Sequence, residues 1–261
     1  MGKKISPKKY KDSRGKKERV VVVMPAYNAE KTLKKTLDDI PEGLADDIIL
    51  VDDGSHDRTV SLAKKLGLQT FVHPQNRGYG GNQKTCYTLA LNKGADIVVM
   101  IHPDYQYDSS LTEEIIRPIL NKRFDIMLGS RIRSRNEALK GGMPRYKYFF
   151  NRALTILQNI VLSQNLSEYH TGFRAFDRKV LEALPFHKFS DDFVFDQDIL
   201  ISSVYQGYKI GEIQVPVRYF PDASSIGFRK SIKYGLGILL DLTRYLLAVS
   251  GIFTSKIFTK K

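Results

Sequence analysis

The sequence VVVVMPAYN at residues 20–28 places four valines and a methionine directly before a proline and a polar group. A continuous β-branched run without polar alternation is typical of a parallel strand that is buried on both faces. Pro25 lacks the backbone N–H that a sheet ladder needs, so we expect the strand to end there. The first strand of a parallel α/β sheet is therefore predicted over residues 20–24.

Further apolar runs follow at the spacing of βαβ units, with helical patterns between them. This alternation predicts a mostly parallel, doubly wound sheet flanked by helices. The predicted strands cover residues 48–51, 70–72, 97–101 and 126–128, and the predicted helices cover residues 29–40, 59–66, about 81–93 and 110–121.

The second half of the chain is less regular and contains no internal repeat. Helices are expected over residues 144–163 and 192–206, and extended segments over residues 169–176 and 213–219. We divide the chain into a basic flexible arm at residues 1–18, one α/β domain at residues 19–222 and an amphipathic helical region at residues 223–261.

Polar clusters follow three of the predicted strands directly, at residues 25–28, 52–55 and 102–106. In doubly wound sheets the ligand lies beyond the carboxyl ends of the strands. We therefore expect these three clusters to gather at one edge of the sheet and to form the functional site.

The sequence Asp52-Asp53-Gly54-Ser55 places two adjacent carboxylates at a strand end. Like charges this close resist ionisation unless a cation or hydrogen-bond donors compensate them. One carboxylate could accept hydrogen bonds from a base or ribose, and the other could lie near a metal. An Asp-Gly turn with a helix cap from Ser55 or Asp57 explains the same residues without a ligand.

His102, Asp104 and Gln106 alternate at the end of the fourth predicted strand. Residues at positions i, i+2 and i+4 of an extended chain share one face, so the three side chains could converge on a divalent cation. Mg²⁺ or Mn²⁺ would bridge a diphosphate there and neutralise leaving-group charge. A loop with capping residues is the alternative.

A Gly-rich loop at residues 77–81 lacks the dinucleotide-binding fingerprint G-x-G-x-x-G, because Gln83 stands at the last position. No acidic residue follows the first βα turn at the ribose-binding offset, which disfavours a nicotinamide enzyme. We expect the loop to let the backbone approach a ligand closely.

Two charged segments follow in the second half. Arg131, with Arg133, Arg135 and Arg145, forms a basic stretch suited to phosphate. Residues 191–198 are acidic, and Asp196 or Asp198 could lie near an acceptor or a departing sugar. A solvated charge run and an acidic helix start are the structural alternatives.

The net charge of +13 points to an anionic partner such as nucleic acid, an acidic membrane surface or a phosphorylated substrate. Nine of the basic residues lie within the first nineteen, and this distribution disfavours a nucleic-acid-binding face. The single cysteine, Cys86, excludes an internal disulfide and fits a reducing, cytoplasmic compartment.

Residues 226–253 predict an amphipathic helix. No charge-free run approaches the ~20 residues that a membrane span requires, so the helix lies at a membrane surface or packs on the domain. Its polar stripe contains Lys233, Gly237, Asp241, Arg244 and Ala248, and its apolar face contains Ile232, Leu236, Leu239, Leu240, Leu246 and Leu247.

Five ordered motifs together resemble family-2 glycosyltransferases, specifically the dolichyl- and polyprenyl-phosphate mannose synthases. The resemblance implies a GT-A fold, a nucleotide-sugar donor such as GDP-mannose or a UDP-sugar, and an inverting transfer of a hexose to a polyprenyl phosphate. It also implies Mg²⁺ or Mn²⁺ as cofactor. The motifs are residues 24–28, residues 51–55, His102-x-Asp104-x-Gln106, residues 129–131 and residues 171–174.

The site residues are assigned on this basis. The family usually has Asp-x-Asp at the metal site, and His102 replaces the first Asp here. We assign nucleotide-sugar binding to Pro25, Ala26, Tyr27, Asn28, Glu30, Asp52, Asp53, Lys84, His102 and Asp104, metal binding to His102, Asp104 and Gln106, acceptor binding to Arg131, Arg145 and Arg218, and catalysis to Asp104, Arg131 and Asp198.

A lipid phosphate acceptor needs no general base, because a phosphate monoester with a second pKa near ~6 is already ionised at neutral pH. A sugar hydroxyl, the alternative acceptor, requires a base, for which Asp198 or Asp196 is the candidate. We expect the protein to lie peripherally at the cytoplasmic face of a membrane. A nucleic-acid-binding protein and a non-catalytic relative that keeps the fold are the alternatives from other classes.

Overall fold

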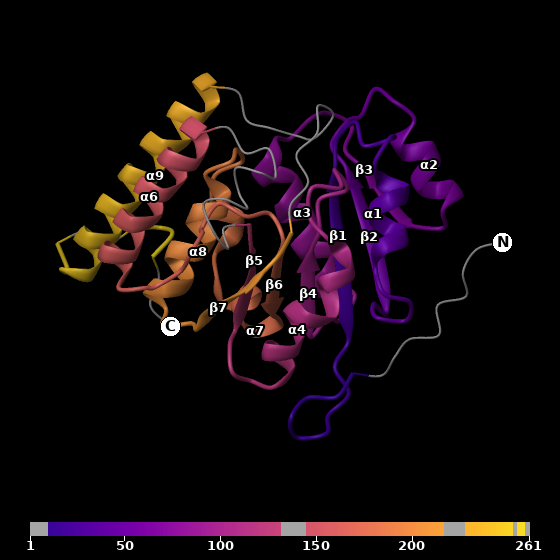
Figure 1. The fold of residues 1–261 in the computed structure, drawn as a ribbon, viewed down its shortest axis with the longest axis horizontal. Helices are drawn as coiled ribbons and strands as arrows, with labels where there is room; N and C mark the ends of the chain where they lie inside the picture. The colour runs from indigo at the N-terminus through magenta and orange to yellow at the C-terminus, as the bar shows by residue number, and fades with distance from the viewer. Residues whose placement is uncertain (1–9, 132–144, 217–227, 253–254, 259–261) are drawn as a thin grey trace.

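The computed structural model describes residues 10–131, 145–216, 228–252 and 255–258. They form a seven-stranded sheet in the order β3-β2-β1-β4-β6-β5-β7, with helices on both faces (Figure 1). β6 runs antiparallel to β4 and β5, and the other neighbours are parallel, so the predicted sheet is confirmed. The strands are β1 (Val20–Ala26), β2 (Asp47–Asp52), β3 (Gln69–Val72), β4 (Ile97–Met100), β5 (Ile126–Ser130), β6 (Arg174–Asp177) and β7 (Ile210–Gln214).

The strand that opens the fold continues through Pro25, contrary to the expectation that it ends there. Pairing of β1 with β4 stops at Val23, whereas pairing with β2 continues to Ala26. Val23 and Pro25 point their backbone groups to the same side of the strand, and Val23 accepts from Ile101 on the β4 side. The proline nitrogen therefore faces the side where the ladder has already ended, and no hydrogen bond is lost.

The two faces of β1 bury separate cores, as a doubly covered parallel sheet requires. Val21 and Val23 pack in one core with α3, α7, α8 and α9, and Val20 and Val22 pack in the other with α1, α2 and α4. The helices are α1 (Leu33–Asp39), α2 (Thr59–Lys65), α3 (Tyr79–Asn92), α4 (Thr112–Leu120), α6 (Arg145–Leu162), α7 (Arg178–Ala183), α8 (Phe195–Tyr205) and α9 (Phe228–Val249).

Several boundaries differ from the sequence-based expectation. α1 begins at Leu33 rather than at Ala29, because the preceding residues form a loop in which Asn28 has a φ of 51°. Only the end of the extended segment 169–176 pairs as β6, and β7 begins three residues before the expected segment 213–219.

Part of the expected flexible arm lies against the domain. Lys11 and Lys17 form an isolated antiparallel bridge, and Asp12 accepts hydrogen bonds from the backbone of Arg14 and Lys16 in the turn between them. Ser13 donates to the carbonyl of Leu120 at the end of α4. Residues 10–18 are therefore anchored, and residues 1–9 lie outside the described part of the chain.

α9 packs on the domain through Ile238, Asp241, Leu242 and Ala248, whereas Lys233 and Arg244 of the predicted polar stripe are exposed together with most of the predicted apolar face. Gly237 packs against Val194, Asp241 is buried, and Ile238 lies in the core. α6 and α9 run side by side at the end of the sheet beyond β7 (Figure 1). None of the helices in the described ranges is long and apolar enough to cross a membrane. The exposed apolar residues of α9 include Ile232, Leu236, Leu239, Leu240, Leu246 and Leu247.

Candidate active site

The loops that follow β1 and β2 are joined by reciprocal hydrogen bonds. The backbone N–H of Asn28 donates to Ser55 Oγ at 2.8 Å, and the Asn28 side-chain oxygen accepts from His56 N at 2.9 Å. Glu30 accepts from the backbone and guanidinium of Arg58 in the same way. Asn28 and Glu30, two of the predicted donor-binding residues, therefore hold the loops after β1 and β2 together at the carboxyl edge of the sheet.

The adjacent carboxylates of Asp52 and Asp53 have different surroundings. Asp52 is fully buried and accepts from the backbone and hydroxyl of Ser55. Asp53 accepts from the backbone N–H groups of Arg77 and Gly78 at 2.8 and 3.0 Å, and it contacts His73 Nδ1 at 2.8 Å. Asp53 thus holds the start of the Gly-rich loop, and hydrogen-bond donors surround both of the paired carboxylates.

The Gly-rich loop approaches protein backbone. Gly80 and Gly81 donate to the carbonyl of Asp191 at 2.8 and 3.2 Å, and a Cβ on Gly78 would lie 2.6 Å from that same oxygen. Lys84 extends the contact by binding the carbonyl of Phe189 and the carboxylate of Asp191. The glycines therefore allow α3 to pack closely against segment 189–192. The approach of this loop to a ligand stays a prediction.

His102 lies at the centre of a chain of polar contacts behind the predicted metal site. Its ring stacks on Tyr79 with a centroid distance of 5.3 Å, and its Nε2 lies 3.1 Å from the Tyr79 hydroxyl. That hydroxyl donates to Asp196 at 2.9 Å, so its oxygen is left to accept from His102 Nε2. Burial lowers the pKa of His102, which favours the neutral imidazole, and the contact with Tyr79 favours a proton on Nε2.

Asp196 is the carboxylate that α8 directs toward this cluster. It accepts from Tyr79 and from Gln83 Nε2 at 3.0 Å, and it forms an ion pair with Arg174 at 3.3 Å. Arg174 is fully buried and also donates to the carbonyls of Thr171 and Tyr169. The sequence motif at residues 171–174 therefore reaches the site through a buried guanidinium.

Asp104 lies two residues beyond His102 in the loop after β4. Its carboxylate accepts a hydrogen bond from the backbone N–H of Gln106 at 3.1 Å. Gln106 is buried and Asp104 is partly exposed. Within the described ranges no three His, Cys, Asp or Glu side chains converge as a metal cage. A cation bound at Asp104 would take most of its ligands from substrate phosphates and water, as is usual for Mg²⁺.

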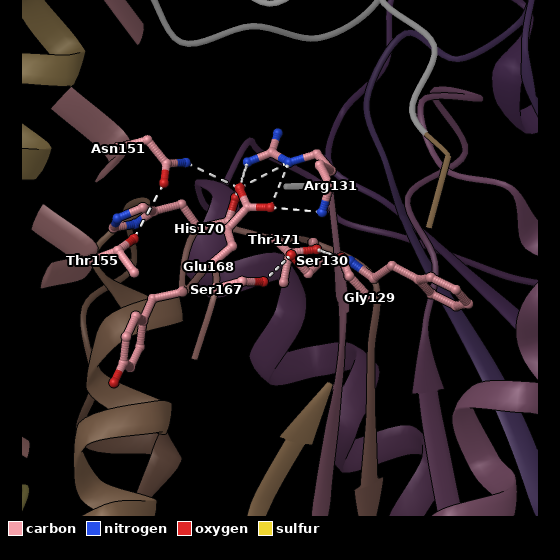
Figure 2. A network of polar contacts seen from close by, with 12 residues as sticks. Gly129, Ser130, Arg131, Asn151, Thr155, Ser167, Glu168, His170 and Thr171 are labelled. Atoms are coloured by element: carbon pink, nitrogen blue, oxygen red, sulfur yellow. Dashed lines mark hydrogen bonds and ion pairs between the residues drawn. The ribbon is translucent and has the colours of Figure 1, made fainter. Parts of the chain in front are cut away.

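Arg131 forms a bidentate contact with Glu168, as Figure 2 shows. The backbone N–H of Arg131 donates to the same carboxylate at 2.9 Å, and Asn151 of α6 donates to it at 3.0 Å. Burial alone would raise the pKa of Glu168, but the charge and hydrogen bonds of Arg131 outweigh burial and hold it below its ordinary value. Arg131 is therefore fixed beside α6 at the end of β5.

His170 connects this network to the helices. Its Nδ1 lies 2.9 Å from the hydroxyl of Tyr234 on α9 and 3.1 Å from the amide nitrogen of Gln197 on α8. Gln158 of α6 donates to the other end of Gln197. Burial lowers the pKa of His170 to about 4, so its imidazole is neutral. α6, α8 and α9 thus meet at one buried polar network.

A family model for glycosyl transferase family 2 matches residues 21–184. The chain belongs to glycosyl transferase family 2. The match runs from β1 through α7 and so includes the loops after β1, β2, β4 and β5, whereas α8, β7 and α9 lie beyond it. The family identified from the sequence motifs is confirmed.

Relatives of this glycosyltransferase include archaeal proteins of similar length. A protein of Methanocaldococcus jannaschii is 30% identical over 87% of this chain and 91% of its own. The UDP-N-acetylglucosamine–dolichyl-phosphate N-acetylglucosaminyltransferase of Methanococcus voltae is 28% identical over 77% of this chain and 86% of its own.

Among solved structures, glucosyl-3-phosphoglycerate synthase from Mycobacterium tuberculosis, crystallised with Mn²⁺, UDP and phosphoglyceric acid, has a similar fold. Its TM-score is 0.66 at 20% identity, and the match covers 91% of this chain and 80% of that chain. The glycosyltransferase therefore has the GT-A fold that the sequence predicts.

The structure separates the predicted site residues of the glycosyltransferase into groups. Pro25 and Ala26 are buried at the end of β1, and Tyr27 is exposed with its ring edge-on to His56. Arg145 is exposed at the start of α6, and Arg218 lies outside the described residues. The sequence left four further residues without a role, namely Tyr79, Glu168, His170 and Arg174. Tyr79 stood in the Gly-rich loop and Arg174 in the motif at residues 171–174.

Asp198 points to the other side of α8 from Asp196. It is 4% exposed, accepts from the backbone of Ser190 at 2.7 Å and faces the buried Asp241 of α9. Burial and the facing Asp241 raise the pKa of Asp198 to about 7. The predicted general base therefore lies at the α8–α9 contact, whereas Asp196 lies at the site.

Asp198→Asn is expected to stabilise the protein increasingly as the pH rises. The pKa of Asp198 is higher in the folded chain than in the unfolded chain, so folding loses stability as the pH rises from about 4 to about 7. Asn does not titrate, so the difference in unfolding free energy between variant and wild type should grow by roughly 2–3 kcal/mol between pH 5 and 8. Urea unfolding at both pH values measures this difference. Asp38→Asn on the surface of α1 is the control. An equal difference at both pH values for Asp198→Asn would contradict the raised pKa of Asp198.

Gly172→Ala is expected to damage the site through contact with His102. A Cβ at Gly172 would lie 2.5 Å from His102 Cδ2 and 2.9 Å from Nε2, so the ring must move. Overpacking of this kind costs roughly 1–3 kcal/mol, and displacement of the ring should lower transfer about tenfold or more. Gly235→Ala on α9 is the matched control, because its Cβ would meet only Leu154 at 4.0 Å. Full activity in Gly172→Ala would show that the position of the ring is unimportant.

Proposed function

We propose that this glycosyltransferase transfers a hexose from a nucleotide sugar, with inversion, to a polyprenyl phosphate at the cytoplasmic surface of a membrane. The observation that carries the proposal is the placement of α9. Its outward stripe is apolar, and its inward residue Tyr234 bonds to His170 beside the Arg131–Glu168 pair. A helix with an apolar outer surface is thus joined directly to the part of the site where an acceptor phosphate would bind. The archaeal relative that acts on dolichyl phosphate supports the same acceptor class.

The donor is proposed to bind at the edge formed by the loops after β1 and β2. Pro25, Ala26 and Asp52 are buried there, and the exposed ring of Tyr27 offers a face to a base. Asn28, Glu30 and Asp53 support this edge through the loop contacts described above, and Lys84 supports it from α3. A preformed edge lowers the ordering cost of binding the nucleotide.

Asp104 is proposed to hold Mg²⁺ or Mn²⁺, with Gln106 and His102 as further candidates. Asp104 is partly exposed, and among the described residues it belongs to no cluster of three or more His, Cys, Asp or Glu side chains. Such a carboxylate fits a cation that also binds the phosphates of a donor. Such a cation would neutralise negative charge on the departing nucleoside diphosphate. His102 would coordinate through Nδ1, because its Nε2 faces the Tyr79 hydroxyl.

The acceptor phosphate oxygen is proposed to attack the anomeric carbon on the face opposite the diphosphate. The new C–O bond forms as the bond to the diphosphate breaks, which inverts the configuration. Arg131 would orient the acceptor phosphate, and its pairing with Glu168 fixes the guanidinium in advance. Arg145 and Arg218 are further proposed contacts of that phosphate. Asp196 holds Tyr79, Gln83 and Arg174 in place.

A sugar hydroxyl remains the alternative acceptor, and it would need a general base. Asp198 is poorly placed for that role, because it is buried against Asp241 and Ser190 on the far side of α8. Asp196 is on the correct side, but its carboxylate already accepts from Tyr79 and Gln83 and pairs with Arg174. These contacts favour an acceptor that is ionised in solution.

The test is transfer to a short-chain polyprenyl phosphate with GDP-mannose, UDP-glucose or UDP-N-acetylglucosamine as donor. We expect one donor to give a glycosyl-phosphate product of inverted configuration, detected by mass spectrometry and NMR. Chelation with EDTA should abolish the reaction, and added Mn²⁺ or Mg²⁺ should restore it. Transfer only to sugar hydroxyls would select the alternative acceptor, and no transfer with any pair would contradict the proposed function.

A further inference from the structure

The outer surface of α6 carries large apolar side chains that the fold leaves uncovered. Phe149 is 70% exposed and Ile160 is 72% exposed, and Phe150 is also exposed. α6 lies beside α9, whose Leu236, Leu240 and other outward residues are apolar as well (Figure 1). We call this joint surface the α6–α9 apolar face. Contiguous exposed apolar patches of this kind mark interaction sites.

The charge of the two helices indicates what covers this face. Their sequences hold a single acidic residue, Asp241, and it is buried. Lys233 pairs with Asp192 of the loop before α8, and Arg244 pairs with Asp241. The sequences of the two helices still hold seven basic residues against one acidic residue, and an exposed apolar surface on helices of this composition complements a bilayer with anionic headgroups. A second copy of the chain would bring the same basic residues together. The basic residues of the two helices are Arg145, Lys147, Arg152, Arg229, Lys230, Lys233 and Arg244.

α6 also connects this face to the site. Phe149 and Phe150 point outward, and the next residue, Asn151, donates to the Glu168 carboxylate that holds Arg131 (Figure 2). Arg152 donates to the carbonyl of Ser167 at 2.7 Å. One helix therefore separates the outward aromatic residues from the proposed acceptor-phosphate contact, and an α-helix with its side chains is only about 10–12 Å across.

We propose that α6 and α9 together form the surface by which this protein docks on an anionic lipid bilayer, and that α6 places the acceptor site directly at that surface. Docking itself stands on the exposed residues and the charge. The delivery of acceptor lipid along α6 rests on the proposed lipid phosphate acceptor.

Co-sedimentation with phosphatidylcholine vesicles, with and without phosphatidylglycerol, tests the docking. Phe149→Ser/Phe150→Ser on α6 and Leu236→Ser/Leu240→Ser on α9 should each lower partitioning to anionic vesicles by about tenfold or more, because each removes two exposed apolar side chains. Phe71→Ser/Val72→Ser is the matched control, since these residues of β3 are also exposed but lie at the opposite edge of the sheet. Ile160→Ser repeats the α6 test at a distant turn if the double variant folds poorly.

Transfer assays test the role of α6 in delivery. The α6 variant should lose transfer to polyprenyl phosphate embedded in vesicles and keep transfer to a water-soluble short-chain acceptor. Wild-type partitioning of the α6 variant would overturn the proposal. A wild-type protein that ignores vesicles and forms a dimer by light scattering, converted to monomer by the α6 variant, would overturn it in favour of a second copy. Vesicle docking that depends on α6, without transfer to any lipid phosphate, would support docking and reject the proposed function.

Discussion

Arg174→Leu is expected to lower the free energy of unfolding by about 3–5 kcal/mol, the usual effect of removing one partner of a buried ion pair. The guanidinium is fully buried and donates to three carbonyls, those of Thr171, Asp196 and Tyr169. Its loss leaves these oxygens unsatisfied and leaves the Asp196 carboxylate without its cation. For a domain of this size the melting temperature should fall by roughly 6–20 °C.

Urea unfolding with a double-mutant cycle checks the origin of that loss. Asp196→Asn removes the charge that Arg174 compensates, so the double variant should be less destabilised than the sum of the two single variants by about 1 kcal/mol or more. Arg117→Leu is the matched control, because Arg117 pairs with Glu113 on the surface of α4 and should contribute only about 0.5 kcal/mol. A loss below about 1 kcal/mol in Arg174→Leu would contradict the structural role.

The strands of the first half could be predicted from the sequence because burial on both faces leaves a continuous apolar run, as in residues 20–24. β6 carries no such run, because its four residues begin with Arg174 and end with Asp177. The antiparallel β6, at Arg174–Asp177, is therefore visible only in the structure. The end of β1 was misplaced because the hydrogen bond that Pro25 cannot make belongs to a neighbour, β4, that stops earlier.

The contacts of the site side chains could likewise be predicted only in part from the sequence. The pair Asp52 and Asp53 stands out in the sequence, but their different environments depend on His73 and Gly78, more than twenty residues away from Asp52. The charge of Arg131 suggested phosphate, and its partner Glu168 lies 37 residues further along the chain. Motif and residue type therefore indicate where the site is, and long-range contacts decide what each carboxylate or guanidinium does.

Asp104→Asn is expected to lower transfer by about 10²- to 10³-fold while leaving the fold intact. The asparagine side-chain oxygen can still accept from the backbone of Gln106, so the loop should keep its shape. The negative charge is lost, and with it the proposed contact to a divalent cation, whose stabilisation of leaving-group charge contributes several kcal/mol, each 1.36 kcal/mol being tenfold in rate.

The measurement is transfer as a function of Mn²⁺ concentration, with the melting temperature recorded for each variant. Asp108→Asn is the matched control, because Asp108 lies four residues further along the same loop and accepts from the backbone and hydroxyl of Ser110. It should lose at most about 1 kcal/mol of cap stability and keep the wild-type response to metal. If Asp104→Asn and Asp108→Asn respond alike to Mn²⁺, the cation is held elsewhere, and the loop after β4 then positions Tyr79 and Asp196 through His102 rather than binding metal.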